Sequence, residues 1–144
     1  MRFVGLLQML LVFAWVGAAT ADEIVVIVHP ERVVDLGPSD LAQIYLKQRR
    51  FWSDGKPIVA VNRNAGSEAR ESFSEAVFGA EARGHVAYWN RQYFKGILPP
   101  LTLASDEAVL RFVAADSRAI GYVHSSRVDE TVRVALRLKT HPGD

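Results

Sequence analysis

The sequence predicts a single α/β domain, a three-layer sandwich in which helices cover both faces of a mainly parallel sheet. Two observations support this prediction. Short runs rich in β-branched residues alternate along the chain with longer segments whose apolar residues recur at helical spacing. Strands separated by helices favour such a sheet, because parallel neighbours need a crossover between them. Once residues 1–21 are set aside, the chain is long enough for one hydrophobic core and too short for two.

The first strand and helix each have a clear local signal. Residues 23–28 are rich in β-branched side chains, and the strand ends at His29-Pro30 because proline cannot continue the hydrogen-bond ladder. Ser39 is expected to be the N-cap of the next helix. The apolar face of that helix consists of Leu41, Ile44 and Tyr45. The basic run at residues 47–50 complements the helix C-terminus, or alternatively contacts an acidic partner.

The rest of the chain repeats this alternation. A strand at residues 58–61 precedes a helix that begins at Glu68 and stops at Gly79. A third helix is expected at residues 81–94. Its apolar stripe, which should face the core, consists of Ala82, Val86, Trp89 and Tyr93. The remaining elements are a helix capped by Ser105, a buried strand at residues 119–123 and an edge strand at residues 131–138.

The first 21 residues have the three parts of a secretory signal peptide. Arg2 supplies the positive charge, Phe3 to Gly17 form an apolar run, and Ala19-Thr20-Ala21 has the small residues that a signal peptidase needs. Cleavage after Ala21 is expected, which predicts a periplasmic protein; an uncleaved membrane anchor is the alternative. The last residues, 141–144, are expected to be a disordered tail.

Composition excludes several functional classes. The chain has 17 basic and 16 acidic residues, and the signal peptide removes only Arg2, so the exported protein is formally neutral. It lacks the basic stripe with which nucleic-acid binders neutralise phosphates. It contains no cysteine, which excludes disulfides, thiol catalysis and cysteine metal sites. No cofactor is expected.

The most informative motif is a turn between the second strand and the second helix, with Arg63, Gly66 and Ser67. A helix N-terminus has unpaired N–H groups and about half a positive charge, so a Gly-Ser turn there, with an arginine beside it, can bind an oxyanion. In the alternative interpretation Ser67 only caps its helix and Arg63 lies in a solvated loop. From the motif alone both interpretations stay open.

Polar residues that follow the apolar strands extend this candidate site. His29 follows the first strand, Asn62 and Arg63 the second, and His124 the strand at residues 119–123. If these strands are all parallel, the four side chains share one edge of the sheet with Ser67, because ligands bind outside the carboxyl ends of parallel strands. The alternative is that polar residues commonly end strands. His29 and His124 could pair on a metal, but without a third histidine no metal site is predicted.

Four ordered segments resemble the phosphate-binding proteins of bacterial ABC transporters, and in particular their short, secreted relatives. These segments are Leu41–Trp52, Arg63-Asn-Ala-Gly-Ser67, Ser105-Asp106 and Ala119-Ile-Gly-Tyr-Val123. The resemblance implies one lobe of a type II periplasmic binding fold over residues 22–140. It also implies that Arg63 grips the oxyanion and that Ser67 donates to it. Glu68-Ala69 stand where the family has Gly-Thr, and the first lobe of the family has no counterpart.

The expected function is therefore non-catalytic recognition of a small oxyanion, with phosphate as the first candidate. An alternative of another class is a protein-interaction module whose open face docks a membrane sensor, a transporter or a second protomer. An enzyme ranks last, because the sequence offers no evident acid/base pair or Gly-x-Ser-x-Gly elbow.

Overall fold

The computed structural model describes residues 22–79 and 84–139. The predicted signal peptide, the predicted tail and Ala82 lie outside these ranges. The strands are β1 (Ile24–Val28), β2 (Val59–Arg63), β3 (Leu101–Leu103), β4 (Ala119–His124) and β5 (Arg133–Arg137). The helices are α1 (Pro38–Tyr45), α2 (Glu68–Phe78), α3 (His85–Phe94) and α4 (Asp106–Ala115), with a 3₁₀ turn, η2, at Ser125–Arg127.

The α/β class is confirmed, but the sheet is mixed and not mainly parallel. Its strand order is β3-β2-β4-β1-β5. β2 is parallel to β3 and to β4, whereas β1 is antiparallel to β4 and to β5. β2, β3 and β4 therefore end at the same edge, which we call the carboxyl edge, and β1 begins there.

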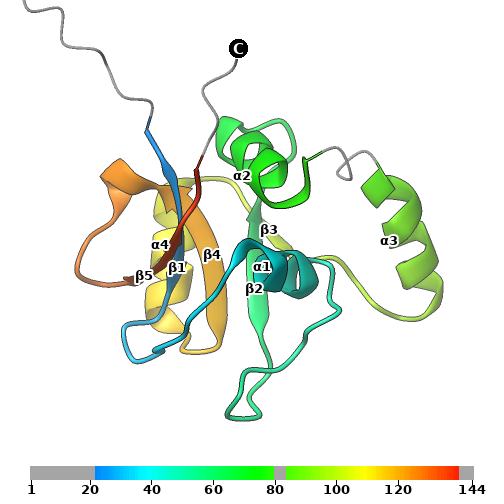
Figure 1. Cartoon of the computed structure of the whole chain (residues 1–144), viewed down its shortest axis with the longest axis horizontal. Helices are drawn as coiled ribbons and strands as arrows, with labels where there is room; N and C mark the ends of the chain where they lie inside the picture. Colours follow the sequence, from blue (N-terminus) through cyan, green and yellow to red (C-terminus); the bar gives the residue numbers. More distant parts are fainter. Residues whose placement is uncertain (1–21, 80–83, 140–144) are drawn as a thin grey trace, which may run out of the picture.

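Helices cover both faces of the sheet (Figure 1), as expected for a three-layer sandwich. α1 and α2 pack on one face, where Tyr45, Phe73 and Tyr122 belong to one buried cluster. α4 packs on the other face, where Val109 and Val113 belong to a second cluster. All five residues of β1 are buried, because alternate side chains enter the two clusters. This explains why β1 has a continuous apolar sequence.

Local capping signals predict most helix boundaries. Ser67 and Ser105 are the N-caps of α2 and α4, and Gly79 is the C-cap of α2, as predicted. The N-cap of α1 is Gly37 instead of Ser39, with Pro38 as the first helical residue. Asp40 completes this cap, because its carboxylate accepts a bond of 2.8 Å from the Gly37 amide.

The third helix differs most from its prediction. α3 lies outside the sandwich, beyond β3, which is an outer strand of the sheet (Figure 1). None of the residues of α3 is buried. Val86 and Tyr93, expected to face the core, are exposed, and Trp89 is half-buried. Val86, Trp89 and Tyr93 do share one face of α3, but no layer of the sandwich packs on that face. Among the described residues, no helix is long and apolar enough to cross a membrane.

Candidate functional site

The candidate site starts where β2 leaves the sheet and α2 begins. Gly66 has a φ of 82°, a left-handed conformation that glycine adopts without steric cost, and it turns the chain into the helix. The Ser67 hydroxyl oxygen accepts a bond of 3.2 Å from the Arg70 amide. The amides of Glu68 and Ala69 make no hydrogen bond within the described ranges. The start of α2 thus keeps two free donors, as the anion-site hypothesis requires.

Arg63 is the last residue of β2 and not part of a solvated loop. Its side chain packs against the protein and does not extend into solvent. Its Nη1 donates to Asp106 Oδ1, and its Nη2 donates to the Ala104 carbonyl over 3.3 Å. The side chains of Arg63 and Asp106 are only 12% and 10% exposed. Arg63 Nε is buried and has no partner among the described residues. The chain's own carboxylate therefore partly satisfies this cation.

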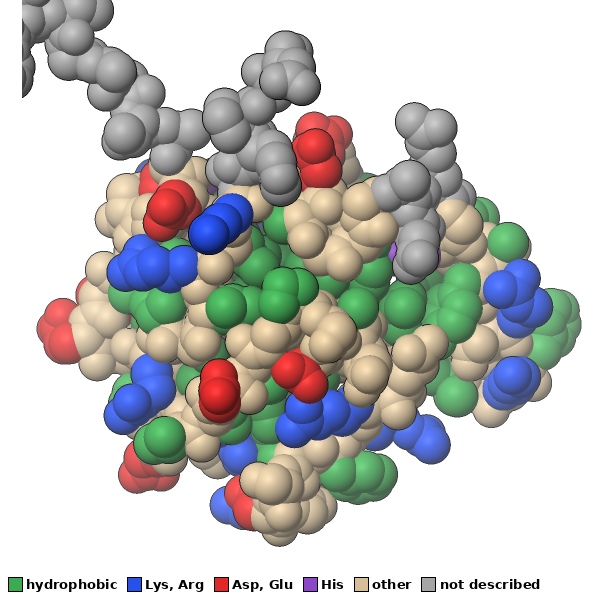
Figure 2. All heavy atoms as spheres, viewed as in Figure 1, with side chains coloured by type: hydrophobic (Ala, Val, Ile, Leu, Met, Phe, Trp, Pro, Cys, Tyr) green, Lys and Arg blue, Asp and Glu red, His purple; other side chains and the backbone are tan. Residues whose placement is uncertain are grey.

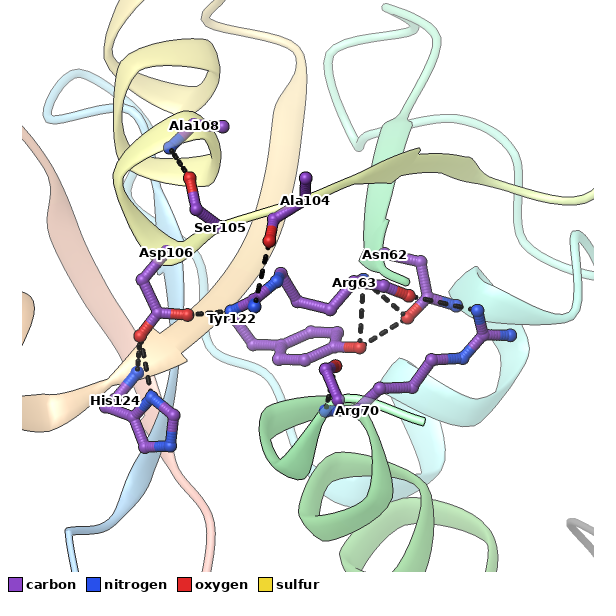
Figure 3. Close-up of polar contacts among 10 residues, drawn as sticks. Asn62, Arg63, Arg70, Ala104, Ser105, Asp106, Ala108, Tyr122 and His124 are labelled. Carbon is purple, nitrogen blue, oxygen red and sulfur yellow. Dashed lines mark hydrogen bonds and ion pairs between the residues drawn. The ribbon is translucent and has the colours of Figure 1, made fainter. Parts of the chain in front are cut away.

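Asp106 also holds His124 at the end of β4 (Figure 3). Asp106 Oδ2 accepts one bond of 3.0 Å from the His124 amide and lies 2.7 Å from His124 Nδ1. Because an ionised carboxylate only accepts, Nδ1 is the protonated ring nitrogen in this pair. Arg63, Asp106 and His124 thus join the ends of β2 and β4 to the start of α4.

A second group of polar contacts fixes the backbone at the end of β2. The Tyr122 hydroxyl donates to Asn62 Oδ1, and the Arg63 amide donates to both oxygens, over 3.2 Å and 3.0 Å (Figure 3). Burial raises the pKa of Tyr122 to about 12, so its hydroxyl stays protonated at physiological pH. Arg70 adds a bond of 3.0 Å to the Arg63 carbonyl. The Asn62 side chain therefore stabilises the backbone at the end of β2.

A hollow of about 470 Å³ lies beside Arg63 on the α4 side of the carboxyl edge. Its charged residues carry both signs, so the hollow is not a simple cationic cup. Its lining consists of Arg63, Ser105, Asp106, Glu107, Leu110, His124 and Arg127.

The structure brings together Asn62, Arg63 and His124, but it places His29 elsewhere. Because β1 is antiparallel to β4, Ile24 lies opposite His124 while Val28 lies opposite Ile120. His29, which follows Val28, is therefore at the other end of the sheet. The prediction that it shares the edge with Arg63 is wrong, and a metal pair with His124 is ruled out. Its place beside His124 is taken by the start of β1.

Asp22 marks that start. Its carboxylate accepts bonds from the Ser125 hydroxyl over 2.7 Å, from the Ser126 amide over 3.1 Å and from the Ser126 hydroxyl. These bonds, with that of the Ser126 hydroxyl as the largest cause, lower the pKa of Asp22 to about 2. The segment that follows His124 is thereby tied to the first described residue.

Sequence reasoning missed three residues of this site: Arg70, Asp106 and Tyr122. Asp106 belongs to the Ser105-Asp106 segment of the family resemblance, but the sequence predicts no role for it in the site. A usable signal was its position, since a short acidic residue directly after a capping serine cannot reach far from the sheet edge. Tyr122 alternates with buried residues in a strand, and its hydroxyl therefore needed a polar partner.

Comparisons with solved structures add the decisive observation. A putative phosphate ABC transporter substrate-binding protein with bound phosphate from Clostridium perfringens superposes with a TM-score of 0.63 and 26% identity, over 84% of this chain and 48% of the other. An ABC-type phosphate transport receptor from Vibrio cholerae gives 0.62 and 21%, over 78% and 45%. This chain is similar to phosphate ABC transporter substrate-binding proteins. PstS from Borrelia burgdorferi gives 0.58 and 19%, over 72% and 41%.

The likeness is partial. The chain spans about half the length of these receptors, in agreement with a single-lobe form. No protein-family model and no curated protein sequence matches it. The neighbours are transport receptors and not enzymes. The structure does pair Asp106 with His124, as in a catalytic Ser-His-Asp arrangement. Within the described ranges, however, no hydroxyl group bonds to the His124 ring, so this pair has no nucleophile beside it.

Proposed function

We propose that this protein is a non-catalytic periplasmic binding protein for a small oxyanion, with phosphate as the first candidate. The anion is held at the carboxyl edge, between the starts of α2 and α4. The Ser67 hydroxyl and the amides of Glu68 and Ala69 donate to it from the α2 side, and Arg63 faces it from the α4 side. The partial likeness to phosphate receptors supports this choice of ligand.

The observation that carries the proposal is the pair of free amides behind the Gly66-Ser67 turn. A helix start with unpaired donors attracts an anion through both hydrogen bonds and the helix dipole. Glu68 is exposed, so its carboxylate can turn away from these amides. Asp106 holds Arg63 in place and accepts a hydrogen bond from it, and it can also accept a hydrogen bond from a protonated phosphate oxygen.

A single lobe binds weakly. An anion on one wall receives only a few charge-assisted bonds, at about 1.5–3 kcal/mol each, against an association cost of ~4–15 kcal/mol. We expect a dissociation constant of about 1 mM for the isolated chain. Tighter binding requires a second binding surface on the opposite side of the anion, supplied by another protomer or by a membrane transporter.

Two matched variants test the position of the anion. Glu68→Gln removes a negative charge at the start of α2, and Glu107→Gln removes one at the start of α4. We expect Glu68→Gln to tighten phosphate binding about two- to five-fold in calorimetry, because a charge near a helix N-terminus contributes about 0.3–1 kcal/mol. Glu107→Gln and Arg118→Gln, the latter at the opposite end of the sheet, should leave it unchanged. The reverse order would place the anion in the hollow beside α4, and the absence of any binding would end the proposal.

A second candidate follows from the ion pair between Arg63 and Asp106. Because this cation is already paired, the carboxyl edge can serve as a docking face for a membrane sensor, a transporter or a second protomer. A sedimentation experiment with and without phosphate separates the two functions. Self-association or partner binding that is independent of phosphate would favour docking over anion binding.

A further inference from the structure

α3 exposes a set of large apolar side chains on one side. Val86 is 76% exposed, Tyr93 66% and Phe94 89%, and Leu98 in the following loop is 61% exposed. At 100° per residue, Val86, Tyr93 and Phe94 fall within one outward arc of the helix. Contiguous exposed apolar groups of this kind commonly mark a binding surface.

The opposite side of α3 holds the helix on the protein. The Tyr88 hydroxyl donates to the Leu46 carbonyl over 2.5 Å. The His85 ring lies edge-on to Phe78, with ring centres 4.4 Å apart. The helix is therefore anchored through this side, and the outward arc is the side that is exposed.

The charged residues of this region are all positive. Residues 82–105 contain no Asp or Glu, whereas Arg91 and Lys95 lie on or directly after α3. In Figure 2, blue and green side chains gather at the α3 end of the molecule and no red ones accompany them. A two-fold contact between two copies of α3 would bring these like charges together, which disfavours a homodimer here. The surface instead fits a partner that is both anionic and apolar.

We propose that α3 docks this protein on the surface of an anionic phospholipid membrane, as an interfacial helix. Two of its exposed residues, Tyr93 and Phe94, are aromatic. Exposed aromatic side chains beside Arg and Lys are typical of helices that lie at the boundary between lipid headgroups and acyl chains. The cations meet the headgroup phosphates, and the apolar arc enters the interface. This inference does not depend on the oxyanion site.

Vesicle sedimentation tests it directly. A chain that begins at Asp22, the first residue of the described fold, is mixed with vesicles of phosphatidylglycerol and phosphatidylcholine or of phosphatidylcholine alone. We expect binding at least tenfold stronger with phosphatidylglycerol, and weaker as salt is raised, because an anionic surface attracts Arg91 and Lys95 and salt screens that attraction. The double variants Arg91→Gln/Lys95→Gln and Tyr93→Ser/Phe94→Ser should each lose about tenfold.

Val33→Ser is the matched control. Val33 is 77% exposed but lies in the loop between β1 and α1, so its replacement should leave vesicle binding unchanged. Circular dichroism and the urea midpoint of each variant confirm that it is folded. Equal binding to both kinds of vesicle, no binding to either, or an equal loss in Val33→Ser would overturn the proposal. Binding through α3 to an acidic protein, without binding to either kind of vesicle, would also overturn it.

Discussion

The starts of α2 and α4 have the same local sequence pattern but opposite surroundings. Each helix begins with a capping serine followed by an acidic residue, Ser67-Glu68 in α2 and Ser105-Asp106 in α4. Asp106 is 9% exposed and bonds to Arg63 and His124, whereas Glu68 is exposed. The carboxylate of Asp106 is fixed and disfavours an anion at the start of α4, whereas the exposed carboxylate of Glu68 can turn away from an anion at the start of α2.

The difference arises from tertiary structure and not from the helices themselves. α4 follows β3 and faces the ends of both β2 and β4, so a short carboxylate at its first position meets a cation and a histidine. α2 has no such partners for Glu68 among the described contacts. The same N-terminal motif thus stabilises the fold at one helix and, in the proposed function, binds a ligand at the other.

The largest expected effect is that of Asp106→Ala. It leaves Arg63 and His124 without their shared acceptor, and removal of one partner of a buried pair costs about 3–5 kcal/mol. The equivalent variant at the start of α2, Glu68→Ala, should change stability by less than about 0.5 kcal/mol. Urea unfolding of both variants measures the contrast. Similar losses in the two would show that the two helix starts are not different.

Gly121→Ala should come next, because α4 packs closely on β4 at this glycine. A Cβ there would lie 2.6 Å from Val109 Cγ1 and 2.8 Å from Val61 Cγ2. We expect a loss of about 1–3 kcal/mol from overpacking. Gly84→Ala is the control, since nothing lies within 4 Å of the added carbon. If Gly121→Ala unfolds no earlier than Gly84→Ala, the close packing of α4 on β4 at this glycine is refuted.

The two caps provide a matched pair. Ser67 and Ser105 each accept a bond from the third helical amide, at 3.2 Å and 3.1 Å, so either alanine variant should cost about 1 kcal/mol of stability. Only Ser67→Ala should also weaken phosphate binding, because the proposed anion lies at the start of α2. Thermal unfolding and calorimetry on the same samples give both quantities. Equal loss of affinity in both variants would contradict the assignment of the ligand to α2.

The smallest effect concerns Asp22, which ties the segment after His124. Hydrogen bonds from Ser126 and Ser125 lower its pKa from 3.8 to about 2, so the folded state favours the ionised form. The resulting stabilisation is present above about pH 4 and is lost as the pH falls towards 2. Asp22 is exposed, and solvent screening keeps the effect below about 1 kcal/mol. The stability difference between the native protein and Asp22→Asn should therefore shrink with acid; a constant difference would refute the tie.

Local signals in the sequence predicted the elements well and their relations poorly. The β-branched runs and the capping serines are read within a few residues, and both helix starts of the carboxyl edge were placed correctly. The direction of β1 has no local signal, and the error moved His29 into the site. The pair of Arg63 and Asp106 spans 43 positions, so no motif contains it.

The stripe on α3 shows a second limit of sequence patterns. Periodicity predicted that Val86 and Tyr93 share a face, which the structure has, but it could not tell whether the protein core or another surface covers that face. Burial depends on which layer packs on the helix, and no layer of the sandwich reaches α3. The proposed contact with lipid rests on that difference.

The most direct test of the account is a phosphate titration followed by amide chemical shifts in a ¹H–¹⁵N spectrum. The account predicts saturable shifts with a dissociation constant of about 1 mM, largest at the amides of Glu68 and Ala69. The amides of Asp106 and Glu107 should shift less, and His29, at the far end of the sheet, should not move. Shifts that never saturate, or that are largest at the start of α4, would contradict the proposal that the anion binds at the start of α2.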